Sequence, residues 1–296
     1  MRRAGVVGLG GMGKALTESL LSHGYPVTCF DRKTEAVAVI CMHGASPAES
    51  AREVAEESDV VFTFLPGPAE VLEVALNPEA GVLAGLAEGG AMIDMSTCTP
   101  EVATELDARF REARRGFVDC PVSGKAPNMS VLVGGKEGVL GDNTQVIQDV
   151  SGRIIYCGAS GAGYAVKLLN QHVKYSSYLA ASEALLVATK MGLDAAQVSL
   201  AIEQCSGGEP GLTTAAEYYR NDMRAMRRHA PASTIEKDML LAEGMASLAG
   251  VDTPSLKVVA EFFRQVGATE FRQRPYPESN EYLNCLRTSS AMETGL

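Results

Sequence analysis

The sequence predicts a Rossmann-type α/β fold, in which a doubly wound parallel sheet is followed by an all-helical C-terminal domain built on a long interdomain helix. Short apolar runs alternate with helix-like segments through the first half of the chain, and this alternation stops near residue 161. Parallel strands that are covered by helices on both faces are buried and therefore apolar, so the alternation predicts a parallel sheet. We expect one domain over residues 1–161 and a second over residues 162–296.

The strand-like runs are short and end at turn residues, and the first of them, "AGVV", is followed by glycines and a helical pattern. Leu16 and Leu20 lie four residues apart in that helix, on one face. The expected strands are 4–7, 26–31, 59–67, 89–97, 116–124, 130–135 and 153–158. The helix-like segments between them are 14–22, 33–43, 48–57, 68–76 and 100–114.

The second half reads as helices and loops. From Tyr164 to Met191 the chain has no proline or glycine, which predicts one helix of about 40 Å, and Gly192 ends it. Further helical patterns cover 194–205, 212–227, 233–249 and 254–266. The last thirty or so residues are polar and contain Pro275 and Pro277, so by composition we expect them to be the least structured part.

Composition excludes several classes of function. The net charge of −10 argues against a nucleic-acid binder, because neutralising phosphates requires a basic surface. The sequence has no uninterrupted apolar stretch that is long enough to predict a membrane span. The seven cysteines are odd in number and scattered, which is typical of reduced thiols in the cytoplasm, and no His or Cys cluster has the spacing of a metal site.

The glycine turn after the first strand has the spacing of a dinucleotide-binding loop, Gly8-Leu9-Gly10-Gly11-Met12-Gly13. In this pattern the first glycine allows the tight turn, the second lets a pyrophosphate approach the backbone, and the third permits close packing of helix and strand. Asp31 ends the next strand, where an acid can bind ribose hydroxyls and repel a 2′-phosphate. We therefore expect NAD as cofactor, with NADP possible because Arg32 and Lys33 follow. A tight turn without a ligand is the alternative.

Lys167 is placed among apolar residues, next to Val166, Leu168 and Leu169, one turn into the long helix. It follows a second glycine run, 157–163, which we interpret as the hinge between the domains. Burial favours the neutral form of an amine, and a neutral amine can act as a general base. The amides of Asn170 and Gln171 fall on or near the same helix face and could orient a substrate hydroxyl. A lysine that extends its ammonium group to solvent is the alternative.

Four stretches, in order, resemble the β-hydroxyacid dehydrogenases, the family of 3-hydroxyisobutyrate dehydrogenase and tartronate semialdehyde reductase, which is related to 6-phosphogluconate dehydrogenase. They are "GVVGLGGMG" (5–13), "DCPVSG" (119–124), "GAGYAVKLLNQ" (161–171) and "EKDMLLA" (236–242), with weaker matches at "FLPGPAEV" (64–71) and "IDMSTCTP" (93–100). The resemblance extends to about residue 265 and implies that Lys167 is the catalytic residue.

The same resemblance implies roles for other residues. Ser123 and Gly124 look like the substrate-binding pair, and Asn170 looks like the amide that accompanies the catalytic lysine. Residues with an implied cofactor contact are Leu65, Pro66, Thr97 and Lys237. Without the shared stretches, a turn serine, a hydroxyl at a strand end or a solvated helix lysine would be the simpler interpretation.

The chain also departs from the family pattern. Lys125 follows Ser123-Gly124 directly, where many members continue with glycine and a longer loop, so Lys125 could hold a second acidic group of the substrate. Ala230 stands where many members carry phenylalanine, and Gln171 stands where some carry a second asparagine. These departures leave the identity of the substrate open.

The expected reaction is hydride transfer between nicotinamide and a small 3-hydroxy acid or the matching semialdehyde, with Lys167 as general acid or base and no metal. The closest expectation is a 3-hydroxyisobutyrate dehydrogenase-like enzyme, acting in the cytoplasm as a homodimer or homotetramer. An imine reductase on the same fold and a non-catalytic dinucleotide-binding module are the alternatives. The resemblance implies that both tend to lack a lysine at position 167.

Overall fold

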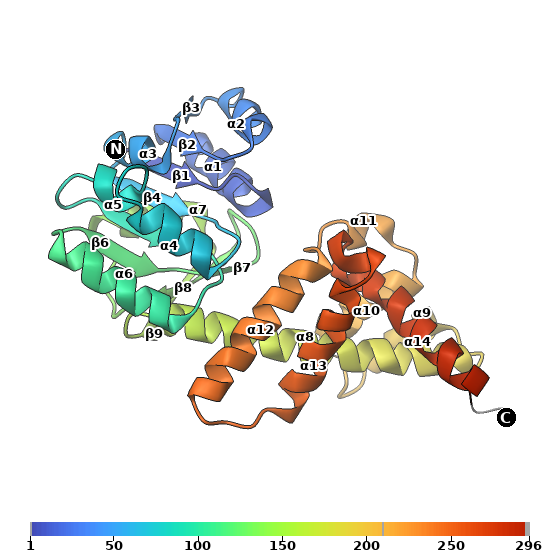
Figure 1. Cartoon of the computed structure of the whole chain (residues 1–296). Coiled ribbons are helices and arrows are strands. Elements are labelled where there is room, and N and C mark those ends of the chain that lie inside the picture. The colour runs from blue at the N-terminus through green and yellow to red at the C-terminus, as the bar shows by residue number, and fades with distance from the viewer. Residues whose placement is uncertain (1, 209, 294–296) are drawn as a thin grey trace. The chain divides into compact units, whose positions relative to one another are not determined.

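A computed structural model describes residues 2–208 and 210–293, which form two compact units. The first unit runs through Lys167 and the second begins at Leu168, so the boundary lies inside one long helix. The sequence placed the domain boundary at 161–162, and that assignment stays a prediction. Each unit is described separately below (Figure 1).

The first unit is built on a parallel sheet of six strands in the order β3-β2-β1-β4-β5-β6. This order reverses direction next to β1, as in a doubly wound fold, and confirms the predicted fold class. The strands are β1 (Ala4–Val7), β2 (Val27–Phe30), β3 (Ser46–Pro47), β4 (Val60–Thr63), β5 (Ala91–Asp94) and β6 (Gly116–Asp119).

Helices cover both faces of this sheet. One apolar core holds Leu16 and Leu20 of α1 together with Ile147 of α7, and a second core holds Val71 of α4 and Leu106 of α6. In Figure 1, α4 and α6 are adjacent in front of the strands. The helices are α1 (Gly11–Ser22), α2 (Thr34–Cys41), α3 (Ala51–Glu56), α4 (Pro68–Leu76), α5 (Val82–Gly85), α6 (Pro100–Glu112) and α7 (Thr144–Val150), with the 3₁₀ turn η1 (Gly141–Asn143) before α7.

The expected strand 116–124 is wrong as one element. The chain leaves the parallel sheet after Asp119, and Pro121, which has no N–H to donate, lies between β6 and β7 (Val122–Ser123). A separate three-stranded sheet follows, in which β7 pairs antiparallel with β8 (Ser130–Gly134) and β8 pairs parallel with β9 (Arg153–Gly158). The short elements β3, α5 and α7 were not expected from the sequence.

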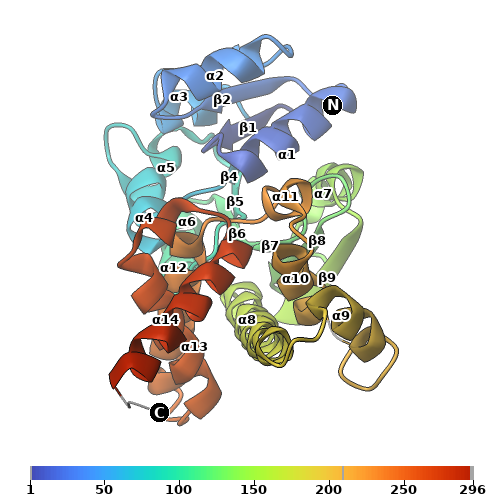
Figure 2. The same cartoon turned by 90° about the vertical axis from the view of Figure 1, so that its right-hand side faces the viewer.

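The second unit is helical, and Figures 1 and 2 show its elements in two views. The long helix α8 (Ala162–Lys190) begins in the first unit and continues into the second. The others are α9 (Ala195–Glu203), α10 (Pro210–Tyr219), α11 (Met223–Met226), α12 (Ala232–Leu248), α13 (Pro254–Gly267) and α14 (Ser279–Glu293), with 3₁₀ turns η2 (Glu270–Gln273) and η3 (Tyr276–Glu278). Among the described helices, none has both the length and the apolar character to cross a bilayer.

Two sequence expectations for this unit are wrong. The segment 212–227 is two helices, because Asn221 takes a φ of 53° and Asp222 caps α11 through the amide of Ala225. The polar C-terminal region is ordered rather than loose: Tyr276 is 1% exposed and its ring packs against Tyr178.

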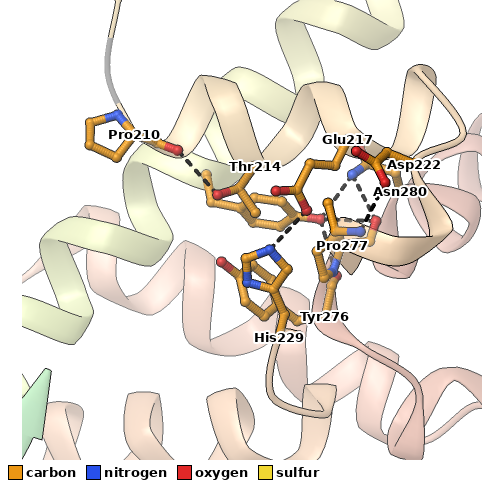
Figure 3. A network of polar contacts seen from close by, with 10 residues as sticks. Pro210, Thr214, Glu217, Asp222, His229, Tyr276, Pro277 and Asn280 are labelled. Carbon is orange, nitrogen blue, oxygen red and sulfur yellow. Dashed lines mark hydrogen bonds and ion pairs between the residues drawn. The ribbon is translucent and has the colours of Figure 1, made fainter. Parts of the chain in front are cut away.

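Polar contacts fix this C-terminal region to the helices around it (Figure 3). Asn280 donates from Nδ2 to the hydroxyl of Tyr178 at 2.8 Å, and that hydroxyl donates to the carbonyl of Tyr276 at 3.1 Å. Beside Tyr276, Nε2 of His229 lies 2.8 Å from Oε2 of Glu217. Composition did not reveal this order, because it depends on partners about one hundred residues away in the chain.

Candidate functional site

The glycine loop connects β1 to α1 as the sequence predicts. Gly8 has a φ of +92°, and a Cβ there would lie 2.2 Å from the carbonyl oxygen of Phe64. A Cβ on Gly13 would lie 1.8 Å from the carbonyl oxygen of Gly8. Both positions therefore require glycine for the turn itself, whether or not a ligand binds.

Gly10 and Gly11 are different, because both are exposed and a Cβ on either would meet no atom within 4 Å. This open space lies at the N-terminus of α1, where no described side chain caps the helix. The backbone N–H groups of a helix N-terminus attract a diphosphate, so the loop fits a dinucleotide. The side chains of Leu9 and Met12 pack against the apolar core.

Asp31 holds the glycine loop directly. It follows β2, and its Oδ2 accepts a hydrogen bond from the amide of Leu9 at 2.7 Å, while Oδ1 accepts one from the amide of Lys33 at 2.8 Å. A carboxylate has about four acceptor positions, so both oxygens can still accept bonds from ribose hydroxyls. The neighbouring side chain of Arg32 is exposed.

The expected cofactor wall lies at the same edge of the sheet. The strand ends are in register, with Val7 opposite Thr63 and Thr63 opposite Asp94. Leu65 follows β4 and donates its amide to Oγ of Ser96 at 2.8 Å; the exposed Pro66 follows Leu65, and Thr97 follows Ser96. Ligands in such folds bind outside the carboxyl ends of the strands, and these residues lie at that edge, so their contact with a cofactor stays a prediction.

The expected substrate pair ends β7. Ser123, Gly124 and Lys125 are all exposed, and Gly124 takes a φ of +87°, which favours glycine at this point. The carbonyl of Lys125 accepts a hydrogen bond from the amide of Asn128 at 3.0 Å, which closes a tight turn after the pair. The Ser123 hydroxyl and the Lys125 ammonium are thus accessible to a substrate in the first unit.

Lys167 is buried, with 8% of its surface exposed, as the sequence predicts. Leu168 beside it is fully buried, but Leu169 and Val173 are 53% and 69% exposed. The apolar residues near Lys167 in the sequence are therefore not all buried, because only one face of α8 packs against the core.

The remaining expected residues belong to the second unit. Gln171 donates from Nε2 to Oδ2 of Asp238 at 2.6 Å, and Nζ of Lys237 lies 2.9 Å from Oδ1 of the same carboxylate. Asn170 is exposed and donates to Oε1 of Gln171 at 3.3 Å. The structure thus brings Gln171 and Lys237 together through Asp238, an acid that the sequence interpretation did not single out although it stands in the matched stretch "EKDMLLA".

Sequence reasoning also missed three buried residues of the first unit, namely Asp94, Asp119 and Tyr164. Burial raises the pKa of Asp94, and it raises the pKa of Asp119 to about 6 although backbone amides lower it. Burial also raises the pKa of Tyr164 well above its usual range. An acid at the end of each of two buried strands was the available signal, since such positions border the ligand edge of the sheet.

Comparison with known proteins places the chain in a family. Residues 3–158 match the NAD binding domain of 6-phosphogluconate dehydrogenase. Residues 161–274 match the family described as NAD-binding of NADP-dependent 3-hydroxyisobutyrate dehydrogenase. Together these two matches cover most of the chain, from residue 3 to residue 274.

Individual relatives agree with this assignment. A probable 3-hydroxyisobutyrate dehydrogenase-like protein of Arabidopsis thaliana is 35% identical over 71% of this chain, and the match spans 64% of that protein, a little under two thirds of its length. A 2-(hydroxymethyl)glutarate dehydrogenase of Eubacterium barkeri is 34% identical over 69% of each chain. The solved 3-hydroxyisobutyrate dehydrogenase of Mycobacterium tuberculosis with L-serine superposes with a TM-score of 0.85 at 28% identity, covering 96% of this chain and 99% of that one. In sequence and in fold, therefore, the chain belongs to the β-hydroxyacid dehydrogenase family.

Proposed function

We propose that the protein is an NAD(P)-dependent dehydrogenase or reductase that transfers hydride between nicotinamide and a small 3-hydroxy acid or the matching semialdehyde. One observation carries this proposal: a single unit contains both the open backbone space at Gly10 and Gly11 and a lysine with 8% exposure. A buried amine in the same unit as a dinucleotide loop suits proton transfer coupled to hydride transfer. 3-Hydroxyisobutyrate is the substrate we consider first, because the Arabidopsis and Mycobacterium relatives bear its name.

In the proposed mechanism Lys167 acts as the general acid or base toward the substrate hydroxyl. During oxidation its neutral amine removes the proton of the substrate hydroxyl, and during reduction its ammonium group returns a proton to the forming alkoxide. Bound nicotinamide supplies the hydride chemistry. The hydroxyl of Ser123 and the amide of Gly124 hold the substrate carboxylate, and Asn170 orients the reacting hydroxyl. The main contribution of these groups is orientation, because holding substrate and cofactor together converts a bimolecular reaction into an effectively intramolecular one.

The deciding experiment is an assay of the purified protein with small 3-hydroxy acids, each tested with NAD and with NADP. Matched alcohols that lack the carboxylate serve as controls, because they test whether the Ser123–Gly124 turn recognises the substrate carboxylate. We expect cofactor reduction with at least one 3-hydroxy acid and none with its matched alcohol. Equal rates on acids and alcohols, or reduction of cyclic imines without any hydroxy-acid activity, would contradict the proposal.

Lys125 adds a finer proposal about the substrate, namely that a further anionic or polar substituent binds to its ammonium group. The lysine is exposed directly after the Ser123–Gly124 turn, and the relative from Eubacterium barkeri is named for a glutarate, which carries a second carboxylate. A charge-assisted hydrogen bond is worth about 1.5–3 kcal/mol, or about ten- to hundredfold in kcat/KM.

The test of this finer proposal is Lys125→Ala, compared with Lys136→Ala, which removes another exposed lysine of the same unit. We expect Lys125→Ala to lower kcat/KM on a substrate with a second carboxylate and to leave 3-hydroxyisobutyrate nearly unchanged. Equal, small losses of kcat/KM on both substrates would show that the Lys125 side chain does not bind the second carboxylate.

We also propose that the protein acts in the cytoplasm as a homodimer or homotetramer. Apolar side chains are exposed on several described helices of the second unit, including Val173 and Met191 at or after α8, Leu240 on α12 and Val258 on α13, and a second copy would cover such surface. The seven cysteines are odd in number and scattered along the chain, which suits a reducing compartment. Light scattering of the purified protein tests the assembly, and a monomer at micromolar concentration would contradict it.

A further inference from the structure

Two carboxylates lie buried side by side beneath the expected cofactor wall. Asp94 ends β5 and Asp119 ends β6, the two residues are paired in register, and both are fully buried. Hydroxyls and backbone amides donate hydrogen bonds to both carboxylates. Buried acids held in this way need every donor in place.

The four acceptor positions of Asp94 are all used. Its Oδ1 accepts hydrogen bonds from the hydroxyls of Thr63 and Ser96, and its Oδ2 accepts one from the hydroxyl of Tyr164 and one from the amide of Ser96 at 3.2 Å. Asp119 instead binds backbone, since Oδ1 accepts from the amide of Gly161 at 2.9 Å and Oδ2 from the amide of Tyr164 at 3.1 Å.

Tyr164 is the residue that joins both carboxylates, one through its hydroxyl and the other through its amide. It is fully buried in the first turn of α8, and Lys167 follows three residues later, close to the same helix face. The first turn of the helix is therefore fixed at two separate points. Glycines make this possible, because a Cβ on Gly163 would lie 2.9 Å from the backbone oxygen of Asp119.

The same cluster reaches the expected cofactor wall. Ser96 donates its hydroxyl proton to Asp94 at 2.7 Å and accepts the amide proton of Leu65 at 2.8 Å. Asp94 thus links the segment Leu65–Pro66 to the start of α8. The thiols of Cys98, Cys120 and Cys157 are further titratable groups near these residues.

We propose that Tyr164 is a positioning residue that sets the direction of the Lys167 side chain by holding the first turn of α8 between Asp94 and Asp119. This inference rests on the proposed catalytic role of Lys167. Because the Tyr164 hydroxyl belongs to the first turn of α8, its loss should change the geometry of the reacting amine more than the affinity for the cofactor. Small displacements of a reacting group cost large factors in rate, so the loss should show in kcat.

The test is Tyr164→Phe, which keeps the ring and removes only the hydroxyl. We expect kcat to fall about tenfold, the pH profile of kcat to shift, and the Kd for NAD to stay within about twofold. The matched control is Tyr25→Phe, which removes another buried tyrosine hydroxyl bonded to an aspartate, Asp149, in the same unit. Its kcat and pH profile should match those of the unmodified protein.

Two further variants separate positioning from general loosening. Thr63→Val removes a different donor from Asp94 and keeps the Tyr164 hydroxyl that fixes α8, so its kcat should fall less than that of Tyr164→Phe. Asp119→Asn weakens the hold on α8 from the amide side, so it should reproduce the Tyr164→Phe pattern, and it serves as the test if Tyr164→Phe folds poorly. An equal loss of kcat in Thr63→Val, or a normal kcat and pH profile in a folded Tyr164→Phe protein, would overturn the inference.

Lys167→Ala shows which proposal has failed. If Lys167→Ala loses turnover while Tyr164→Phe keeps it, the catalytic role of Lys167 stands and only the positioning role is overturned. If Lys167→Ala keeps normal turnover, the proposed mechanism fails, and the positioning role fails with it.

Discussion

The two units hold their buried acids in different ways. In the first unit, Asp94 and Asp119 are satisfied by hydroxyls and backbone amides, whereas in the second unit Asp238 has the ammonium group of Lys237 2.9 Å away and the amide of Gln171 as a donor. Neutral donors stabilise a carboxylate without cancelling its charge, which is why burial still raises the pKa of Asp119 to about 6. A lysine neutralises the charge of a buried carboxylate, so removing that lysine leaves the carboxylate with an uncompensated charge.

The difference extends to the surroundings of each acid. In the second unit a further lysine, Lys174, lies over the rings of Tyr175 and Tyr276 at 5.0 and 5.6 Å from their centroids. Burial lowers the pKa of Lys174, and the charge of Asp238 opposes this effect. The first unit therefore concentrates buried acids and the second concentrates cations around one acid, so substitutions in the two units should respond differently to pH and to charge removal.

The largest expected effect comes from Lys167, the last residue of the first unit. Lys167→Ala should lower kcat by about 10²- to 10⁴-fold, because a general acid or base contributes that much, while the Kd for NAD stays unchanged. Stopped-flow turnover and cofactor titration by fluorescence measure the two quantities. Lys190→Ala, an exposed lysine in the last turn of the same helix, is the control and should keep normal turnover. Normal turnover in Lys167→Ala would remove the catalytic assignment.

A second prediction tests the ion pair of the second unit. Lys237→Met should lower the free energy of unfolding by about 3 kcal/mol, because it removes the ammonium group that lies 2.9 Å from the buried carboxylate of Asp238. Urea denaturation gives this quantity. The control is Lys257→Met, whose ion pair with Asp252 is exposed and should leave stability unchanged. Equal effects of the two substitutions would show that burial of Asp238 does not govern the cost.

The sequence predicted some of these features and missed others for a physical reason. The strands β1, β4 and β5 were found because a doubly buried strand is apolar along its whole length. Burial of Lys167 was found because its immediate neighbours are apolar. The bond between Tyr164 and Asp94 was not found, because it joins residues that are 70 positions apart and neither shows its partner locally.

The C-terminal region gives the same lesson in the other direction. Its prolines and polar residues predicted a loose segment, yet Ser279 and Asn280 are each 1% exposed and α14 follows. A buried polar residue is stable only when its hydrogen bonds are made, and here the partner is Tyr178 on α8. Composition records the polarity but not the partner, so the expectation was wrong.

The third prediction uses pH to compare the units. The folded-state pKa of Asp119, about 6, lies above the ordinary 3.8, so between these values the folded protein keeps a proton that the unfolded chain releases. Stability from this group is therefore present at low pH and decreases as pH rises, by up to about 3 kcal/mol. Asp119→Asn removes this dependence. The unfolding free energy of the unmodified protein, taken relative to that of the Asp119→Asn protein, should therefore decrease from pH 4 to pH 7. A difference that stays constant with pH would contradict the raised pKa.

The smallest expected effect concerns the choice of cofactor and rests on Asp31. Its carboxylate holds the amides of Leu9 and Lys33 and would lie where a 2′-phosphate carries negative charge, so NAD should be preferred. Asp31→Asn removes the charge but replaces one acceptor oxygen with an NH₂ group, which forfeits one of the two loop bonds. Its kcat/KM should therefore fall modestly with NAD and rise with NADP, changing the ratio by about tenfold, or about 1.4 kcal/mol. Arg32→Ala, measured beside it, separates repulsion by the acid from attraction by the arginine. Comparable kcat/KM for the two cofactors in the unmodified protein, with a loss of NADP use in Arg32→Ala, would show that the arginine binds the 2′-phosphate and that Asp31 serves to hold the loop.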